Sequence, residues 1–224
     1  MALARDTTVT AEQRARGVMR RAVGPAVSQK TSPAELRRQV TNLASGTYVD
    51  DILTEQDSTL YRWPERLSDA VRVWIEPSSE VAGWDPHLPQ LTREVFDEWS
   101  LAEFPLRFAF VYDSTDADMA IRWIGRFPPA DGQRIGVTER TQTSDFLIAR
   151  ARISIALHDS TGRTLPATIV GGIVRHEVGH ALGLNHANDA TSVMYREAAT
   201  HTLSASDRAT LRLLYLVPGG SLKD

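Results

Sequence analysis

The sequence contains no cysteine, and none of its apolar runs approaches the length of a membrane-spanning helix. The missing cysteines exclude disulfide bridges, thiolate metal ligands and a cysteine nucleophile. A membrane span needs about 18 consecutive apolar residues, so we expect none here. Neither sign of charge dominates, since the net charge is -3. The composition therefore predicts no nucleic-acid partner and no attraction to an anionic membrane.

The N-terminus also lacks the apolar core that a signal peptide requires. Residues 1–21, MALARDTTVTAEQRARGVMRR, are interrupted by charges throughout. No signal peptide is visible, so either the protein is not exported by that route or the sequence begins after the signal. Composition alone leaves the compartment open.

Two regions of the chain differ in character. Residues 1–62 show no strand-like alternation but contain two helical stretches, near 10–22 and from Pro33 to about Leu43. Ser32 is placed to cap the second stretch, which begins with a proline. We therefore expect a helical N-terminal extension over residues 1–62, flexible or regulatory, followed by a domain that spans residues 63–224.

The second region predicts an α/β (α+β) domain. Its apolar residues alternate in several short runs and follow helical spacing in others. The order is strand, helix, four strands, helix and helix. The predicted strands are 71–75, 106–112, 119–123, 134–139 and 148–157, and the predicted helices lie around 91–99, from about Pro166 onward, and after the capping pair Ser204 and Asp207.

Three histidines and a glutamate stand close together in Arg175–His186, RHEVGHALGLNH. His176 and His180 are four residues apart, so on a helix they lie on one face, one turn apart. Their imidazoles can then reach one ion at about 2.0–2.1 Å. Glu177 flanks such an ion without binding it, which is where a base for a metal-bound water belongs.

The third histidine needs a break in the helix. His186 lies six residues beyond His180, and on a continuous helix it would point away from the metal face. Gly183 lies between them and can end a helix in a left-handed conformation. A bare two-histidine match often occurs by chance, but three histidines with the glycine favour a metal site. The remaining histidines have no partner at ligand spacing and are interpreted as ordinary residues: His87, His158 and His201.

The segment HEVGHALGLNH resembles the HExxHxxGxxH signature of the metzincin zinc peptidases. Met194, in SVMY, resembles the methionine of the Met-turn of that family. Tyr195 directly after it and Asp189 before it resemble the spacing of matrixins, in the leaner bacterial-type form. Serralysins and astacins have a tyrosine where this chain has Arg196, and adamalysins have an aspartate where it has Ala187.

The resemblance implies a metzincin-like domain with a twisted mixed five-stranded sheet, an active-site helix, a Met-turn and a C-terminal helix. It also implies one catalytic Zn²⁺ on His176, His180 and His186, with a water in the fourth position. Glu177 would take the proton of that water as it attacks the scissile carbonyl.

Two further roles follow from the same resemblance. Met194 is expected to form an apolar floor beneath the metal, because a thioether is a poor zinc ligand beside imidazole. Tyr195 is expected to line the pocket for the residue after the cleaved bond, although a role in the core fits it equally well. The strand at 134–139 corresponds in order to the edge strand along which such peptidases bind an extended substrate.

The chain departs from animal matrixins before the catalytic helix. Between Arg126 and Arg163 it offers a single histidine, His158, so we expect no second, structural zinc. Animal matrixins also have calcium loops rich in Asp and Gly, and calcium stays possible here although the sequence does not support a site for it. Without cysteine, an inhibitory N-terminal segment would have to cap the metal with a carboxylate, such as Asp50 or Asp51.

We therefore expect a zinc-dependent endopeptidase that cleaves peptide or protein substrates. One alternative is another zinc amide hydrolase acting on cell-wall peptides, and a second is a non-catalytic binding protein stabilised by its metal. Glu177 favours an enzyme, because a structural metal site needs no base beside it. The resemblance favours an extracellular or periplasmic protein, and a monomer is favoured although the sequence does not determine the oligomeric state.

Overall fold

The computed structural model describes residues 31–65, 69–128, 130, 133–197 and 202–223. One compact unit runs from Ser32 to Asp224. Residues 32–62, which we expected to be part of an extension, thus belong to the same compact unit as the domain that follows. The helix predicted near residues 10–22 lies outside the described residues.

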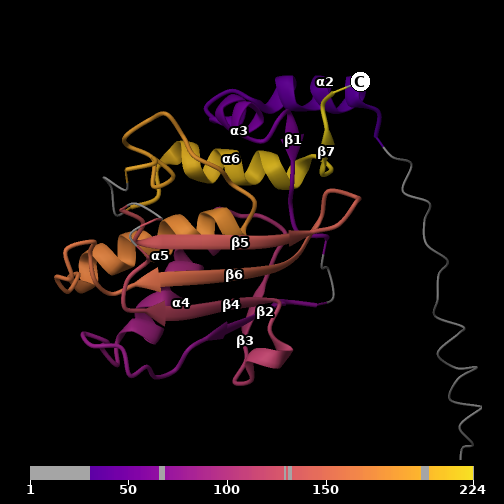
Figure 1. The fold of residues 1–224 in the computed structure, drawn as a ribbon. Coiled ribbons are helices and arrows are strands. Elements are labelled where there is room, and N and C mark those ends of the chain that lie inside the picture. The colour runs from indigo at the N-terminus through magenta and orange to yellow at the C-terminus, as the bar shows by residue number, and fades with distance from the viewer. Residues whose placement is uncertain (1–30, 66–68, 129, 131–132, 198–201, 224) are drawn as a thin grey trace, which may run out of the picture. The chain divides into compact units, whose positions relative to one another are not determined.

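A mixed five-stranded sheet forms the centre of this unit, as predicted (Figure 1). The strand order is β3-β2-β4-β6-β5, and every neighbouring pair is parallel except β5 and β6. β5 therefore runs against the others along one edge. The strands are β2 (Val71–Ile75), β3 (Phe108–Phe110), β4 (Met119–Ile124), β5 (Gly136–Gln142) and β6 (Ile148–Ala156).

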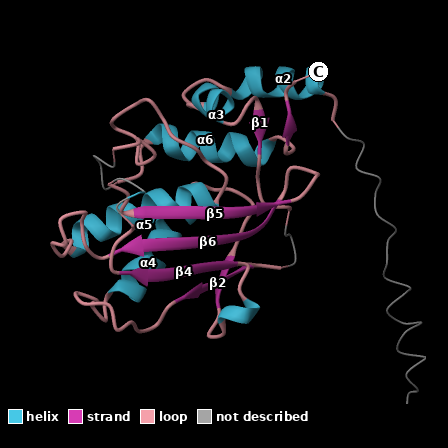
Figure 2. Ribbon diagram, in the orientation of Figure 1, coloured by secondary structure: helices cyan, strands magenta, loops and turns pink. Residues whose placement is uncertain are grey.

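One face of the sheet is apolar and is covered by two helices, α4 (Leu88–Ser100) and α5 (Ala167–Ala181) (Figure 2). Because side chains alternate between the faces of a strand, the buried residues of β2 and β4 point to this side, as do Ala151, Ile153 and Ile155 of β6. Val73, Ile121 and Ile153 on these strands are at most 1% exposed. Burying such side chains contributes about 1.5–3 kcal/mol each.

The N-terminal helices pack beside the last helix, α6 (Ala205–Leu216). α2 (Pro33–Leu43) has the predicted bounds, and the Ser32 hydroxyl accepts a 3.3 Å hydrogen bond from the Glu35 amide. The next helix, α3 (Val49–Glu55), was not predicted. Apolar side chains of both helices lie in the main core: Leu36, Val40, Val49 and Ile52.

A small second sheet joins a strand that follows α3 to a strand near the C-terminus. β1 (Thr59–Leu60) pairs antiparallel with β7 (Gly220–Ser221), which follows α6. The capping box at the start of α6 is confirmed, since Ser204 and Asp207 bond to each other's backbone amides. Among the described residues, no helix combines the length and apolarity that crossing a membrane requires.

Candidate metal centre and catalytic cleft

Helix α5 ends where the sequence predicted a break. Its last residue is Ala181, and Gly183 has φ = +109°, in the region that side chains disfavour. A Cβ atom on Gly183 would lie 2.4 Å from the carbonyl oxygen of Tyr61, so no other residue fits without moving the backbone. The chain turns sharply here, and the Leu184 amide donates back to the Gly179 carbonyl at 3.0 Å.

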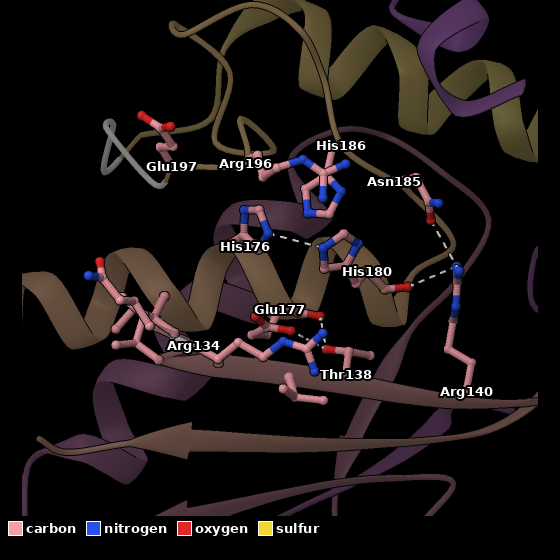
Figure 3. A pocket seen from close by; sticks show the side chains of 15 residues that line it. Arg134, Thr138, Arg140, His176, Glu177, His180, Asn185, His186, Arg196 and Glu197 are labelled. Carbon is pink, nitrogen blue, oxygen red and sulfur yellow. Dashed lines mark hydrogen bonds between the residues drawn. The ribbon is translucent and has the colours of Figure 1, made fainter. Parts of the chain in front are cut away.

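The turn brings His186 to the two histidines of α5 (Figure 3). The Nε2 atoms of His176 and His180 are 3.0 Å apart, and one ligand atom from each of the three imidazoles lies within 4.8 Å of the others. Two nitrogens bound to one tetrahedral zinc would lie roughly 3.3 Å apart, given bonds of about 2.0–2.1 Å. The spacing and the all-imidazole donor set therefore fit a zinc ion.

Each imidazole is oriented through its other nitrogen. The Nδ1 atoms of His176 and His180 lie 2.8 Å from the Val193 carbonyl and 3.0 Å from the Leu184 carbonyl. The Nδ1 of His186 lies 2.8 Å from a carboxylate oxygen of Glu55. Because these oxygens accept hydrogen bonds, Nδ1 carries the proton in each ring, and Nε2 is left with its lone pair for a metal.

Burial also keeps the two helical imidazoles neutral. It lowers the pKa of His176 and holds the pKa of His180 well below its usual value, and neighbouring histidines act in the same direction. Only the neutral imidazole binds a metal, so the environment favours the form that a ligand needs.

Glu177 lies between the imidazoles and β5, where it is 5% exposed (Figure 3). Burial raises its pKa to about 7, against the opposing effects of the Thr138 hydroxyl and Arg134. The Thr138 Oγ1 lies 2.7 Å from the carboxylate Oε2, to which it can donate. Gly136 leaves room for the carboxylate, because a Cβ there would lie 2.4 Å from Oε1.

Met194 packs against the histidine helix at Gly179, and its role as an apolar floor for the metal stays a prediction. It is fully buried, and a Cβ on Gly179 would lie only 2.3 Å from its sulfur. The turn that carries it is fixed by Asp207, which accepts hydrogen bonds from the Ser192 hydroxyl and, at 3.0 Å, from the Val193 amide. The carbonyl that orients His176 is thus part of a braced turn.

The site opens into a cleft of about 880 Å³ between β5 and the exposed side of α5. The three imidazoles, Glu177 and the edge strand line it, together with Arg196 and Glu197. Tyr195 is not among the described lining residues; it is half-buried, and its backbone pairs with Ala187. A role for Tyr195 in the substrate pocket therefore stays a prediction.

Other residues singled out from the sequence lie apart from the cluster. His158 bonds to the Gly125 carbonyl, and His87 bonds to Asp85. Within the described chain, the group suited to a metal is His176, His180 and His186. His201 lies outside the described residues.

The carboxylate that reaches the cluster from the N-terminal segment is Glu55, which sequence reasoning missed. Asp51 instead bonds to Asn188, with its oxygens 2.9 and 2.7 Å from the amide and side-chain nitrogens. Glu55 approaches the Nδ1 side of His186, whereas a capping carboxylate would have to approach the Nε2 side. Burial raises the pKa of Glu55, but hydrogen bonds from His186 and Arg196 outweigh this effect and lower it.

These features define a metzincin-like domain: a mixed sheet, a histidine helix broken at glycine, and a methionine turn beneath it. The particular family follows from comparison with known proteins. The chain belongs to the matrixin family, whose sequence model matches residues 75–216.

The chain is also similar to the Arabidopsis thaliana protein named Metalloendoproteinase 1-MMP. The two are 29% identical over 134 residues, which cover 55% of this chain and 36% of that protein. The matched part thus spans about a third of the length of the plant relative.

Proposed function

We propose that the protein is a zinc-dependent endopeptidase that hydrolyses peptide bonds in extended segments of protein substrates. The observation that carries this proposal is a buried carboxylate, Glu177, beside three convergent imidazoles in an open cleft. A purely structural zinc site is closed by four protein ligands, whereas a catalytic site has three and an open position. Membership of the matrixin family supports the same function.

In this proposal His176, His180 and His186 hold one zinc ion through their Nε2 atoms. A bound zinc lowers the pKa of a water molecule to about 7 and polarises the scissile carbonyl. The second nitrogen of each imidazole is already engaged, so the rings are oriented before the metal arrives. Such preorganisation lowers the cost of binding.

Glu177 acts as the general base and then as the general acid. Its carboxylate accepts a proton from the attacking water and delivers it to the departing amine. In the metal-free chain burial raises its pKa to about 7, and a group that titrates near the working pH both accepts and donates protons readily. The Thr138 hydroxyl restrains the carboxylate in the orientation that faces the cleft.

The edge strand β5 offers the substrate a main-chain partner. It pairs with β6 on one side only, so its other edge has free amide and carbonyl groups for an extended peptide. The family's usual place of action favours an extracellular or periplasmic protein, and we propose a monomer as the active form.

The test measures zinc content and casein cleavage for the wild type and for Glu177→Ala and Glu177→Gln. We expect about one zinc per chain in all three proteins, because Glu177 is not a proposed ligand. Cleavage should fall by a factor of about 10²–10⁴ in both variants, as expected for loss of a general acid–base group.

Full casein cleavage by Glu177→Ala would refute the mechanism. Cleavage confined to cell-wall crosslinks, with casein untouched, would favour the alternative amide hydrolase. A chain that binds zinc but cleaves neither substrate would favour a binding protein.

A further inference from the structure

We propose that Glu55 is a positioning residue for the third zinc ligand, so that helix α3 is part of the metal site. The inference rests on the proposed zinc site and names a residue outside the matrixin match, which begins at residue 75. Glu55 does not reach the face of the imidazole that would meet the metal.

Glu55 binds His186 through both of its carboxylate oxygens. One oxygen accepts from Nδ1 at 2.8 Å, and the other accepts from the main-chain amide of His186 at 3.0 Å. The first contact fixes the rotation and tautomer of the ring, and the second fixes the backbone that carries it. A carboxylate on Nδ1 also makes Nε2 a stronger donor to a metal.

The same carboxylate ties His186 to the chain that follows the methionine turn. The Arg196 guanidinium donates to Glu55 at 2.8 Å, and both His186 and Arg196 line the cleft. The Glu55 side chain is 30% exposed, so its contacts are partly sheltered from solvent. Glu55 therefore bonds to two residues that line the cleft.

The residue after Glu55 supports the same loop. Asn185, directly before His186, accepts hydrogen bonds from Gln56 at 2.5 Å and from Arg140 at 3.1 Å. Arg140 also donates to the His180 carbonyl at 3.2 Å. The end of α3 thus contacts both the third histidine and the residue before it.

The histidines of α5 have no comparable dependence on the N-terminal segment. Main-chain carbonyls hold their Nδ1 atoms, and no side-chain substitution removes a carbonyl. The Nδ1 of His186 is instead held by one side chain, which lies 131 residues earlier in the sequence. Removing that side chain should weaken zinc binding without touching a ligand.

The experiment compares zinc affinity, measured by competition with a chromophoric chelator, in the full-length wild type, Glu55→Ala, Glu55→Gln and Asp51→Ala. We expect Glu55→Ala to lose about 10–100-fold in affinity, the usual effect of removing a residue that orients a metal-bound histidine. Glu55→Gln should lose less, because its amide oxygen still accepts from Nδ1.

Asp51→Ala is the matched control. It removes a carboxylate from the same helix and two hydrogen bonds to the same loop, at Asn188, but no bond to a histidine. We expect its zinc affinity to stay within about threefold of the wild type, well below the loss expected for an orienting residue. The absorption spectrum of the cobalt(II)-substituted protein adds a second readout, which should change in Glu55→Ala and not in Asp51→Ala.

Wild-type zinc affinity in Glu55→Ala would overturn the inference. Equal losses of zinc affinity in Glu55→Ala and Asp51→Ala would also overturn it, because they would show that any contact between α3 and the loop has the same effect. Failure of the wild type to bind zinc would instead overturn the proposed function. Unfolding of the metal-free variants is measured alongside, and Glu55→Gln provides the comparison if Glu55→Ala does not fold.

Discussion

The functional groups of this site are held in two different ways. His176 and His180 are oriented by the main-chain carbonyls of Val193 and Leu184. His186 and Glu177 are oriented by side chains, the carboxylate of Glu55 and the hydroxyl of Thr138. His176, Glu177 and His180 all belong to α5, whereas His186 lies in the segment after the helix ends.

This difference predicts how each group responds to mutation. A group held by a carbonyl moves only if the backbone moves, so its disruption should be accompanied by a loss of stability. A group held by a side chain can be released by one substitution at little cost to the fold. Measurements of stability and of function should therefore separate the two classes.

The largest effect is expected at Gly183, where the backbone itself is disturbed. Gly183→Ala places a Cβ atom 2.4 Å from the Tyr61 carbonyl oxygen at φ = +109°. Strain and steric conflict together should lower the free energy of unfolding by about 3–5 kcal/mol. The shift also displaces the Leu184 carbonyl, so zinc affinity should fall as well. Urea denaturation and chelator competition measure the two effects.

Gly162→Ala is the control for backbone strain alone. Gly162 also has a positive φ, +87°, but no atom lies within 4 Å of a Cβ placed there. We expect a loss of about 1–2 kcal/mol with unchanged zinc affinity. Equal losses in the two variants would show that contact with Tyr61 contributes nothing.

A somewhat smaller effect is expected beneath the histidine helix. Met194→Ala empties a fully buried position and should lower the free energy of unfolding by about 3 kcal/mol. Because the Val193 carbonyl is next to it, zinc affinity should also decrease. Met194→Leu nearly conserves volume and should cost less than about 1.5 kcal/mol. A large stability loss in Met194→Ala with wild-type zinc affinity would contradict the coupling of this turn to His176.

The parts of the fold that sequence reasoning predicted are those with long, regular patterns. β2 has the predicted bounds, and α5 begins one residue after Pro166. The histidine helix and its break were predicted as well, since glycine has a distinct conformational freedom at that position. Local periodicity and local geometry were sufficient for these features.

The features that were missed depend on short elements or distant contacts. α3 has seven residues, too few for a clear helical period, and its Tyr48 cap makes no side-chain hydrogen bond. The two-residue strands β1 and β7 lack a pattern of their own. Glu55 acquires its role only when folding brings it to His186, so nothing near it in the sequence indicates that role.

The smallest effect is expected at Thr138, whose hydroxyl we propose to orient the carboxylate of Glu177. Thr138→Val keeps the shape of the side chain but removes the hydroxyl that lies 2.7 Å from the carboxylate. Losing about 1 kcal/mol of hydrogen bonding should lower kcat about fivefold. KM and zinc content should change little, because no proposed ligand is lost, and the free energy of unfolding should fall by no more than about 1 kcal/mol, since the same hydroxyl also lies 2.9 Å from the Glu177 carbonyl. Thr138→Ser retains the hydroxyl and should keep most of the activity. If Thr138→Ser lowers kcat while Thr138→Val keeps it, the methyl group rather than the hydrogen bond positions the base, and Glu177 would belong with the groups that packing holds.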